Sequence, residues 1–343
     1  MFGDYYYKVH AASSTSFGSQ YSGLGKNANA FELRRVYFGY NYNISERFTT
    51  QLLLAYENKD DNLGNGNRGF YLKLANIRWK NILPNTDIVA GQMYTPSFPL
   101  LSERIWAYRS IEKTAIDLRK FSVSNDVGIA MQTRFDSLGT YGMNVMIGNG
   151  TAAKIESNGF KKVYADFYAN FLKRRLIFDL YGDWEKVLIL PGYHKIKTTL
   201  KAFLAYQTDK FTIGIEVSPQ IQTKYTLDSL MSNPTKIDTV NAIPVTASLY
   251  IRGTILKDKL GFFVRHDFYD PDRNYKKDVY YFSGYNNTEE MFGVAGIDFT
   301  PEKNIHIMPN IYFNQCTNKS STAKEKAKTD FDLVPRITVS YLF

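Results

Sequence analysis

The sequence predicts an all-β protein, a transmembrane antiparallel β-barrel of about 16 strands. Three observations predict it. Apolar and polar residues alternate with period two through most of the chain, and the connections between these segments alternate between short and long. Aromatic residues make up 15% of the chain and gather at the predicted strand ends. Because no linker-like stretch interrupts the pattern, we expect one domain, residues 1–343.

The alternation is clearest in residues 211–218, where the odd positions are Phe, Ile, Ile and Val and the even positions are Thr, Gly, Glu and Ser. A helix would not keep this period. Residues 31–41 alternate poorly, and the adjacent Arg34 and Arg35 indicate a bulge or a strand end there. The predicted strands are 4–13, 31–41, 48–58, 68–81, 87–95, 126–136, 141–149, 162–171, 176–185, 198–208, 211–218, 241–254, 260–269, 289–299, 305–314 and 333–343.

The connections indicate how the barrel is oriented. Those after even-numbered strands are short, and those after odd-numbered strands are mostly long, as between residues 219 and 240. Short periplasmic turns and long extracellular loops are typical of bacterial barrels, whereas a soluble sandwich has no reason to sort its loops by length. With an even number of strands, both termini lie on the periplasmic side. We therefore expect the bacterial outer membrane as the location, with its lipids as partners.

Composition and charge narrow the classes of function. The net charge is +9, but the basic residues are interleaved with apolar strand residues, so nucleic acid is not an expected partner. The single cysteine, Cys316, excludes an intrachain disulfide and is interpreted as an incidental loop thiol. The four histidines are dispersed without the spacing of metal ligands, and no catalytic arrangement is visible. We expect no enzyme activity, no metal and no cofactor.

The two ends of the chain bear on export and assembly. No signal peptide is visible after Met1, so the sequence is expected to be the mature form of an exported protein. The last strand alternates and ends on Tyr341, Leu342 and Phe343. Tyr341 and Phe343 resemble the terminal signal read by the bacterial barrel-assembly machinery, which is therefore an expected partner.

The longest connection, residues 96–125, follows the fifth strand. Its many Leu, Ile and Trp residues would be costly to expose fully, which favours folding against the inner wall of the barrel as a constriction. The alternatives are a loop that caps the barrel and one that packs on a neighbouring subunit. Five basic against three acidic residues give this segment a net charge of +2. The candidate constriction residues are Arg104, Arg109, Lys113, Arg119, Lys120 and Glu112.

A family resemblance appears in residues 31–135. Residues 91–98 read GQMYTPSF and residues 108–113 read YRSIEK, which is similar to the "GQ-x-x-x-P-F" and "ERS" region of the phosphate-selective porin O/P family. Residues 31–40 look like that family's second strand with its paired arginines. The chain departs from the pattern at Ser97, between Pro96 and Phe98. The resemblance implies a passive, anion-favouring channel of Gram-negative outer membranes, with a homotrimer as one assembly.

Strand parity indicates which wall residues face the lumen. Nine basic and seven acidic strand positions are expected to do so, a small positive excess. The wall residues chosen as candidates are Arg34, Arg134, Arg252 and Arg265. Rings of Arg and Lys favour anions in pores. We therefore expect a porin that passes small hydrophilic, anionic or neutral solutes with weak anion preference. The alternative is a closed-lumen barrel that serves as a structural or interaction subunit of an outer-membrane complex.

Overall fold

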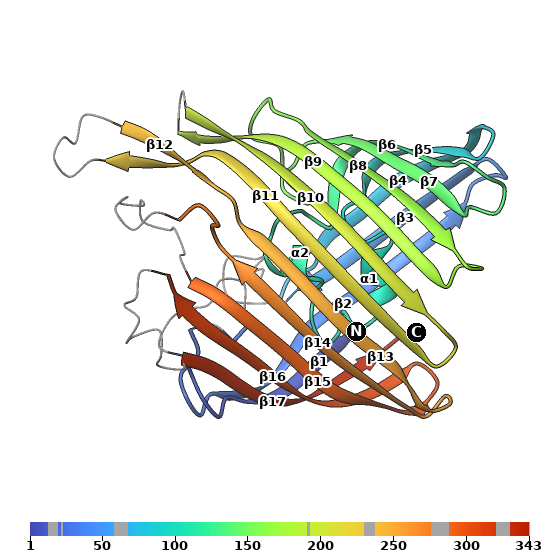
Figure 1. Cartoon of the computed structure of the whole chain (residues 1–343). Helices are drawn as coiled ribbons and strands as arrows, with labels where there is room; N and C mark the ends of the chain where they lie inside the picture. The colour runs from blue at the N-terminus through green and yellow to red at the C-terminus, as the bar shows by residue number, and fades with distance from the viewer. Residues whose placement is uncertain are drawn as a thin grey trace.

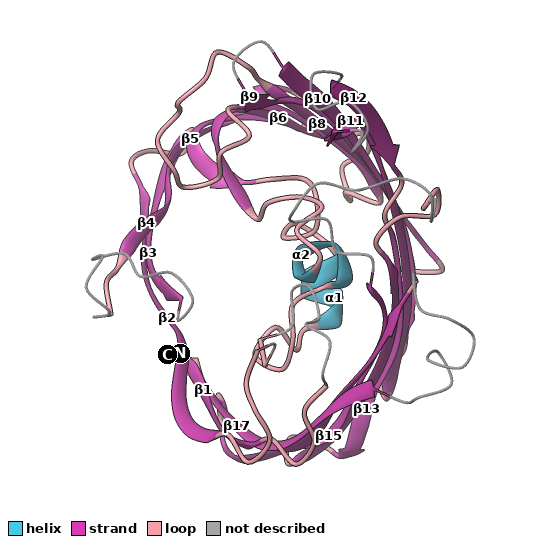
Figure 2. Ribbon diagram, turned by 90° about the vertical axis from the view of Figure 1, so that its left-hand side faces the viewer, coloured by secondary structure: helices cyan, strands magenta, loops and turns pink. Residues whose placement is uncertain are grey.

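The computed structural model describes residues 1–12, 20–21, 23–57, 68–190, 193–229, 237–275, 288–319 and 330–342. They form a closed antiparallel barrel with two short helices inside it (Figures 1 and 2). The elements are β1 (Phe2–Tyr7), β2 (Asn29–Asn43), β3 (Phe48–Glu57), β4 (Tyr71–Leu83), β5 (Thr86–Tyr94), α1 (Ser102–Trp106), α2 (Ala115–Leu118), β6 (Asn125–Arg134), β7 (Tyr141–Gly148), β8 (Lys162–Phe171), β9 (Leu176–Leu190), β10 (Tyr193–Gln207), β11 (Phe211–Ser229), β12 (Ile237–Ala242), β13 (Val245–Leu256), β14 (Leu260–Asp270), β15 (Thr288–Glu302), β16 (Ile305–Asn318) and β17 (Asp330–Tyr341).

Each strand pairs with its neighbours in chain order, and β1 pairs with both β2 and β17, which closes the barrel. The strands β12 and β13 both pair with β11, β13 along its first half and β12 along its second. The two are therefore parts of one wall position, interrupted at Ile243 and Pro244, where the proline has no N–H to offer the ladder. The wall thus has 16 strand positions, which confirms the predicted fold class.

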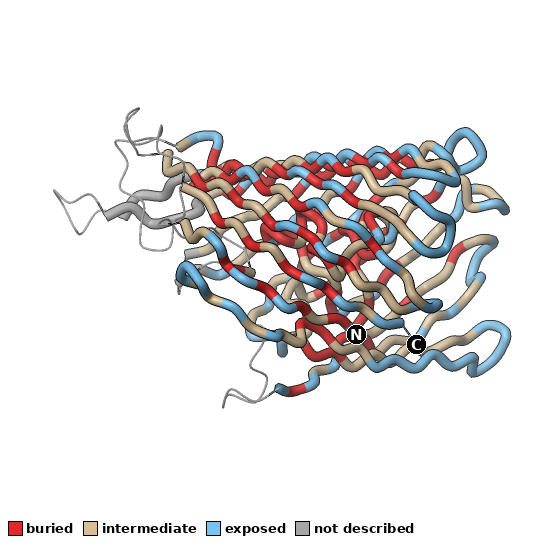
Figure 3. Tube along the Cα trace, turned by 90° about the horizontal axis from the view of Figure 1, so that it is seen from below, coloured by how far each residue is buried: buried red, intermediate tan, exposed pale blue. Residues whose placement is uncertain are grey.

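The barrel is polar inside and apolar outside, the reverse of a soluble protein. In β11 the outward residues Ile213, Ile215 and Val217 are 39–45% exposed, whereas the inward residues Thr212 and Glu216 are buried. Figure 3 shows buried and exposed positions alternating along the strands. Exposed aromatic residues lie at or near strand ends, among them Trp79, Phe135, Phe171 and Phe299. This is the surface that a lipid bilayer requires of a barrel. No helix in the described ranges has the length and apolarity to cross a membrane.

Several predicted strand limits were wrong. The connection predicted at 219–240 is largely strand, because β11 runs on to Ser229 and β12 begins at Ile237. Likewise β9 continues to Leu190 and β10 already begins at Tyr193, both beyond the predicted limits. Polar, lysine-containing stretches can continue a strand wherever the neighbouring strand supplies its backbone partners. Cys316 is also not a loop thiol, since it lies in β16 and is buried.

The two ends of the chain lie side by side on the wall (Figure 2). The terminal ammonium of Met1 donates a hydrogen bond to the carbonyl of Tyr341 at 2.7 Å. Tyr341 pairs with Ile305 at the start of β16 and is 37% exposed. Phe343 lies outside the described residues, so the role of Tyr341 and Phe343 in assembly stays a prediction.

A row of three glycines crosses the wall where the long connection leaves it. Gly91 on β5, Gly128 on β6 and Gly148 on β7 are direct partners in the register. A Cβ on Gly128 would lie 2.1 Å from the carbonyl oxygen of Ile147 and 2.7 Å from the Cα of Gly148. Gly91 also has a φ of +113°, which other residues rarely adopt. These glycines let three strands approach closely at the base of the connection.

We expect the substitution Gly128→Ala to lower the free energy of unfolding by about 1–3 kcal/mol, because the added methyl group meets backbone atoms that cannot move aside. The measurement is urea unfolding in detergent or lipid. Gly293→Ala on β15 is the matched control, since no described atom lies within 4 Å of its added Cβ. Equal shifts of the unfolding midpoint for the two variants would contradict the close approach.

Candidate functional site

The connection between β5 and β6, residues 95–124, is called the inner loop from here on. It carries α1 and α2 and lies inside the ring of strands (Figure 2). Its apolar side chains are buried against the wall: Trp106 and Ile111 join one core cluster, and Phe98, Ile116 and Phe121 join another. Burial of these side chains supplies the favourable free energy that brings the loop inward.

Hydrogen bonds join the beginning of the inner loop to its end. The backbone N–H of Thr95 donates to the carbonyl of Ser124 at 3.1 Å. The hydroxyls of Thr95 and Ser97 both donate to the carbonyl of Val123, at 2.5 and 3.1 Å. Ser97, the departure from the family pattern, therefore has a structural role here. Nearby, the side chain of Gln92 donates to two successive carbonyls of β4, at 2.8 and 3.1 Å, beside a register shift in the pairing of β3 with β4.

Arginines of the wall donate hydrogen bonds to backbone carbonyls of the inner loop. Arg34 on β2 donates to Ser110 at 2.8 Å, and Arg336 on β17 donates to Ile111 at 2.7 Å. Two more arginines do the same: Arg252 donates to Ile105 at 2.8 Å, and Arg265 donates to Lys113. A loop enclosed by a barrel needs donors for its carbonyls, and a guanidinium supplies up to five. These contacts hold the loop against β2, β13, β14 and β17.

Other contacts fix the loop to the remaining wall. Arg119 forms an ion pair with Glu290 on β15 at 2.8 Å, and both side chains are at most 2% exposed. Glu216 on β11 accepts a hydrogen bond from the N–H of Ile116 at 3.2 Å. On β10, Lys201 donates to the carbonyl of Ser97 and pairs with Asp179. The loop is therefore held along its length against the wall from β9 to β17, and Arg34 adds a contact from β2.

The four wall candidates chosen from the sequence divide into two groups. Arg34, Arg252 and Arg265 all face inward but hold the inner loop, so their guanidinium groups are engaged with protein atoms. Arg265 also forms two hydrogen bonds with Asp267. Arg134 is exposed at the end of β6 beside a short turn. Strand parity finds residues that face the lumen, but it does not show whether the loop covers them.

The six loop candidates also divide. Arg109 lies between Glu103 and Asp117, 2.8 Å from the latter, and Arg119 is paired with Glu290 as above. Glu112 is buried, and Lys120 is exposed.

Arg104 and Lys113 differ from Arg109 and Arg119. Neither Arg104 nor Lys113 has a carboxylate within 4.0 Å among the residues that the structure describes. Arg104 is exposed, whereas Lys113 is partly buried and lies near enough to Asp117 for the two charges to interact.

The pKa shifts of Lys113 and Asp117 indicate an excess of positive charge around them. Asp117 raises the pKa of Lys113, but burial and the positive charges of Arg35 and Arg109 outweigh it, so this pKa is lowered. Burial alone would raise the pKa of Asp117. The positive charges of Lys113, Arg109 and Arg35 outweigh burial, so this pKa lies below its usual value. Both shifts have the direction that an excess of cations produces.

The sequence analysis missed the wall cluster opposite this part of the loop. Arg35 on β2 is paired in register with Glu57 on β3, and the two side chains lie 3.1 Å apart. Lys73 on β4 reaches the same carboxylate, and the hydroxyl of Tyr37 donates to it at 3.1 Å. The pairing of β1 with β2 shifts register between Phe2 and Gly3, so Arg34 and Arg35 can both be buried inside. The paired arginines were the available signal, since the sequence already indicated a bulge there.

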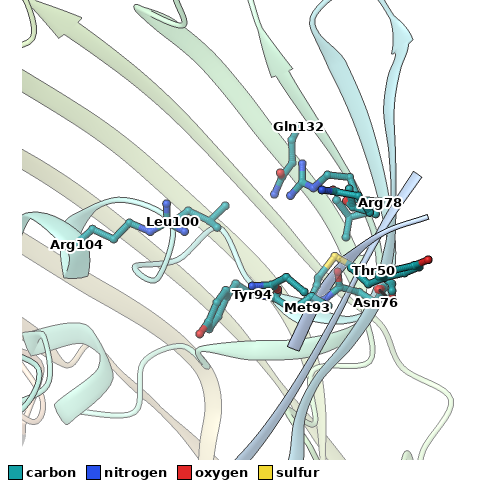
Figure 4. A pocket seen from close by; sticks show the side chains of 14 residues that line it. Thr50, Asn76, Arg78, Met93, Tyr94, Leu100, Arg104 and Gln132 are labelled. Carbon is teal, nitrogen blue, oxygen red and sulfur yellow. Dashed lines mark hydrogen bonds between the residues drawn. The ribbon is translucent and has the colours of Figure 1, made fainter. Parts of the chain in front are cut away.

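One side of the lumen stays open. From β9 to β17 the inward side chains are buried under the loop, as in Asp183, Lys201 and Arg265. On β2 and β3 the inward residues toward one end remain partly or largely exposed, as in Asn41 and Gln51, whereas Arg35 farther along β2 is buried. A cavity of about 360 Å³ lies on this side, between the loop residues Leu100 and Arg104 and the wall (Figure 4). The loop therefore narrows the lumen without filling it.

Comparisons with known proteins give the same fold. The outer membrane channel DcaP of Acinetobacter baumannii is similar, with a TM-score of 0.67 and 11% identity over 100% of this chain and 95% of that chain. An anion-selective porin from Comamonas acidovorans has a TM-score of 0.64 and 11% identity over 100% and 98%. The trimer form of in-vitro folded OmpT, an outer membrane protein of Vibrio cholerae, has a TM-score of 0.55 and 9% identity over 99% and 98%.

No family model and no curated protein matches the sequence. At these identities the structural likeness shows the fold of outer-membrane porins. It supports a porin-like barrel and does not single out the phosphate-selective family that residues 31–135 resemble.

We expect Arg119→Met to loosen the inner loop, because it leaves Glu290 buried without its cation, at a cost of about 3–5 kcal/mol. Amide hydrogen exchange of residues 115–124 in the folded barrel should then accelerate by about a hundredfold or more. Arg104→Met is the matched control, since Arg104 has no carboxylate partner among the described residues. Unchanged exchange in Arg119→Met would mean that apolar packing alone holds the loop.

Proposed function

We propose that this chain is an outer-membrane porin, a passive diffusion channel for small hydrophilic solutes with a weak preference for anions. One observation carries the proposal. The inner loop is held against the wall from β9 to β17, and the side toward β2–β4 keeps a water-exposed cavity next to Arg104. The apolar outer surface supports a place in the bacterial outer membrane, with lipids around it.

The charges at the narrowed part support the anion preference. Counting Arg35, Lys73, Arg104, Arg109 and Lys113 against Glu57, Glu103 and Asp117 gives five cations and three carboxylates. In a narrow lumen such charges act over roughly 8 Å, the Debye length at physiological salt. The constriction can therefore set selectivity although many other lumen charges are paired. Among the candidate constriction residues, we assign this role to Arg104 and Lys113 first, with Arg109, Arg119, Lys120 and Glu112 shaping the loop.

Two parts of the proposal concern assembly. The trimer form of the similar OmpT structure favours a homotrimer for this chain as well. The barrel-assembly machinery is proposed as a partner in insertion, on the alternation of the last strand. The closed-lumen alternative, a structural or interaction subunit of an outer-membrane complex, predicts a folded barrel without conductance.

The first test is the reversal potential of a planar bilayer in a potassium chloride gradient. Wild-type protein should prefer chloride, and Arg104→Gln combined with Lys113→Gln should move the permeability ratio most of the way to one, because it removes two cations that have no carboxylate within 4.0 Å among the described residues. The exchange Arg104→Lys with Lys113→Arg keeps both charges and should keep the preference. A cation-selective wild type would refute the charge argument, and a protein without conductance would favour the closed-lumen alternative.

The preference for chloride should also depend on pH. Lys113 has a lowered pKa, so its ammonium loses its proton at a lower pH than that of an ordinary lysine, whose pKa is about 10.4. The positive charge is lost as the pH rises, at a lower pH than for an ordinary lysine, so the anion preference should already fall on the acid side of the ordinary lysine titration. Lys113→Arg should remove this fall, because arginine stays charged. The same pH profile in wild type and variant would assign the titration to another group.

A further inference from the structure

The cavity beside Arg104 has a lining of unusual chemistry. Its volume of about 360 Å³ lies within the range of about 300–1,000 Å³ for sites of small ligands. The wall side carries side-chain amides and hydroxyls, whereas the loop side carries Arg104 and Leu100. Figure 4 shows Gln132, Arg78 and Asn76 on the wall, across the cavity from Arg104.

The amides form a band across adjacent strands. Asn41 on β2 is paired in register with Gln51 on β3, and Gln51 is paired with Asn76 on β4. Direct partners point to the same face of a sheet, and here that face is the lumen. Gln132 extends the lining from β6. A solute passing along this wall would meet the row of Asn41, Gln51 and Asn76, with Gln132 four residues away along β6 from the position in register with Asn76.

Most of these amides have no hydrogen-bond partner among the residues that the structure describes. Asn76 donates a hydrogen bond to the carbonyl of Gln92 at 3.1 Å. The side chains of Asn41, Gln51 and Gln132 make no hydrogen bond to any other residue in the described ranges of the chain. Each primary amide offers two donors and two acceptor lone pairs. Hydroxyl groups, which both donate and accept, match these amides better than a purely anionic or purely apolar solute does.

Arg104 supplies a single uncancelled charge. Its Nε donates to the carbonyl of Pro99 at 3.1 Å, which orients the guanidinium, and the side chain is otherwise exposed to the cavity. The other guanidinium in the lining, Arg78, is 2.8 Å from Asp87 and is thereby neutralised. The cavity therefore presents one net positive charge opposite an uncharged hydrogen-bonding wall.

We infer that this cavity is a transit site for small monoanions that carry several hydroxyl groups, the class of sugar acids and related hydroxy acids. The inference rests on the proposed channel function and names its solute class. The carboxylate would pair with Arg104 while the hydroxyls exchange hydrogen bonds with Asn41, Gln51 and Gln132. An inorganic anion would use only Arg104, and a neutral sugar would use only the amide band. Binding at such a site must stay weak enough for release, as conduction requires.

The test is block of the chloride current by added solutes in planar bilayers. Gluconate and hexanoate have the same charge and the same number of carbons, but only gluconate carries hydroxyls. Two additional hydrogen bonds should let gluconate reach half-block at about a tenfold lower concentration than hexanoate. Glucose, without a charge, should block less than gluconate. Equal block by gluconate and hexanoate would overturn the inference and leave the channel function intact.

Variants locate the site. Gln51→Met combined with Gln132→Met nearly preserves side-chain size and should remove the advantage of gluconate over hexanoate. Arg104→Gln should weaken the block by both anions alike and keep the advantage of gluconate. An advantage that survives in the double variant would place hydroxyl recognition elsewhere and overturn the inference. If that variant does not insert, the wild-type comparison of the two anions still decides. A wild type without conductance would overturn the channel function and the inference together.

Discussion

The hydrogen bonds and ion pairs between the wall and the inner loop are the interactions on which the lumen depends. A loop inside a barrel brings backbone carbonyls away from bulk water, and each unpaired one is costly. Arg34, Arg252, Arg265 and Arg336 meet this need from several strands at once. Buried charges of this kind need partners themselves, and Asp4, Asp267 and the loop carbonyls supply them. Because these contacts hold the loop to one side, the other side remains open.

The same contacts distinguish the cations that hold the loop in place from those that remain able to interact with a solute. Arg119 and Arg265 are buried and each is paired with a carboxylate, so truncating either is expected to cost stability before it changes selectivity. Arg104 and Lys113 have no carboxylate within 4.0 Å in the described part of the chain. Arg104 is exposed, and an exposed cation without an ion pair contributes little to stability while its field reaches a passing solute directly. The overall charge of +9 is therefore a poor guide to selectivity, because most lumen cations already have partners.

Local departures from regular strand geometry occur where the site is formed. The register shift beside Arg34 lets two adjacent arginines enter the lumen, one toward the loop and one toward Glu57. The glycines at 91, 128 and 148 allow close strand approach beneath the loop, and Gln92 donates to carbonyls of β4 at the next irregularity. Regular strands alone would give a uniform cylinder. These irregular positions place the loop and the facing wall cluster asymmetrically.

The sequence by itself determined the barrel, because a wall with lipid outside and water inside imposes period two on every strand and sorts the connections by length. It also located the long connection and the lumen side of residues such as Arg265. It did not determine the strand ends near 190 and 229, since a ladder can continue through polar residues when a neighbour supplies the hydrogen bonds. Nor could it show that Arg104 is exposed and Arg119 buried, or that Asn41 is exposed and Thr212 buried. Strand parity says only that a residue faces inward, and it says nothing about burial within the loop. Only the tertiary structure decided which of these side chains the inner loop covers, since that depends on contacts between residues such as Arg119 and Glu290 that lie far apart in the chain.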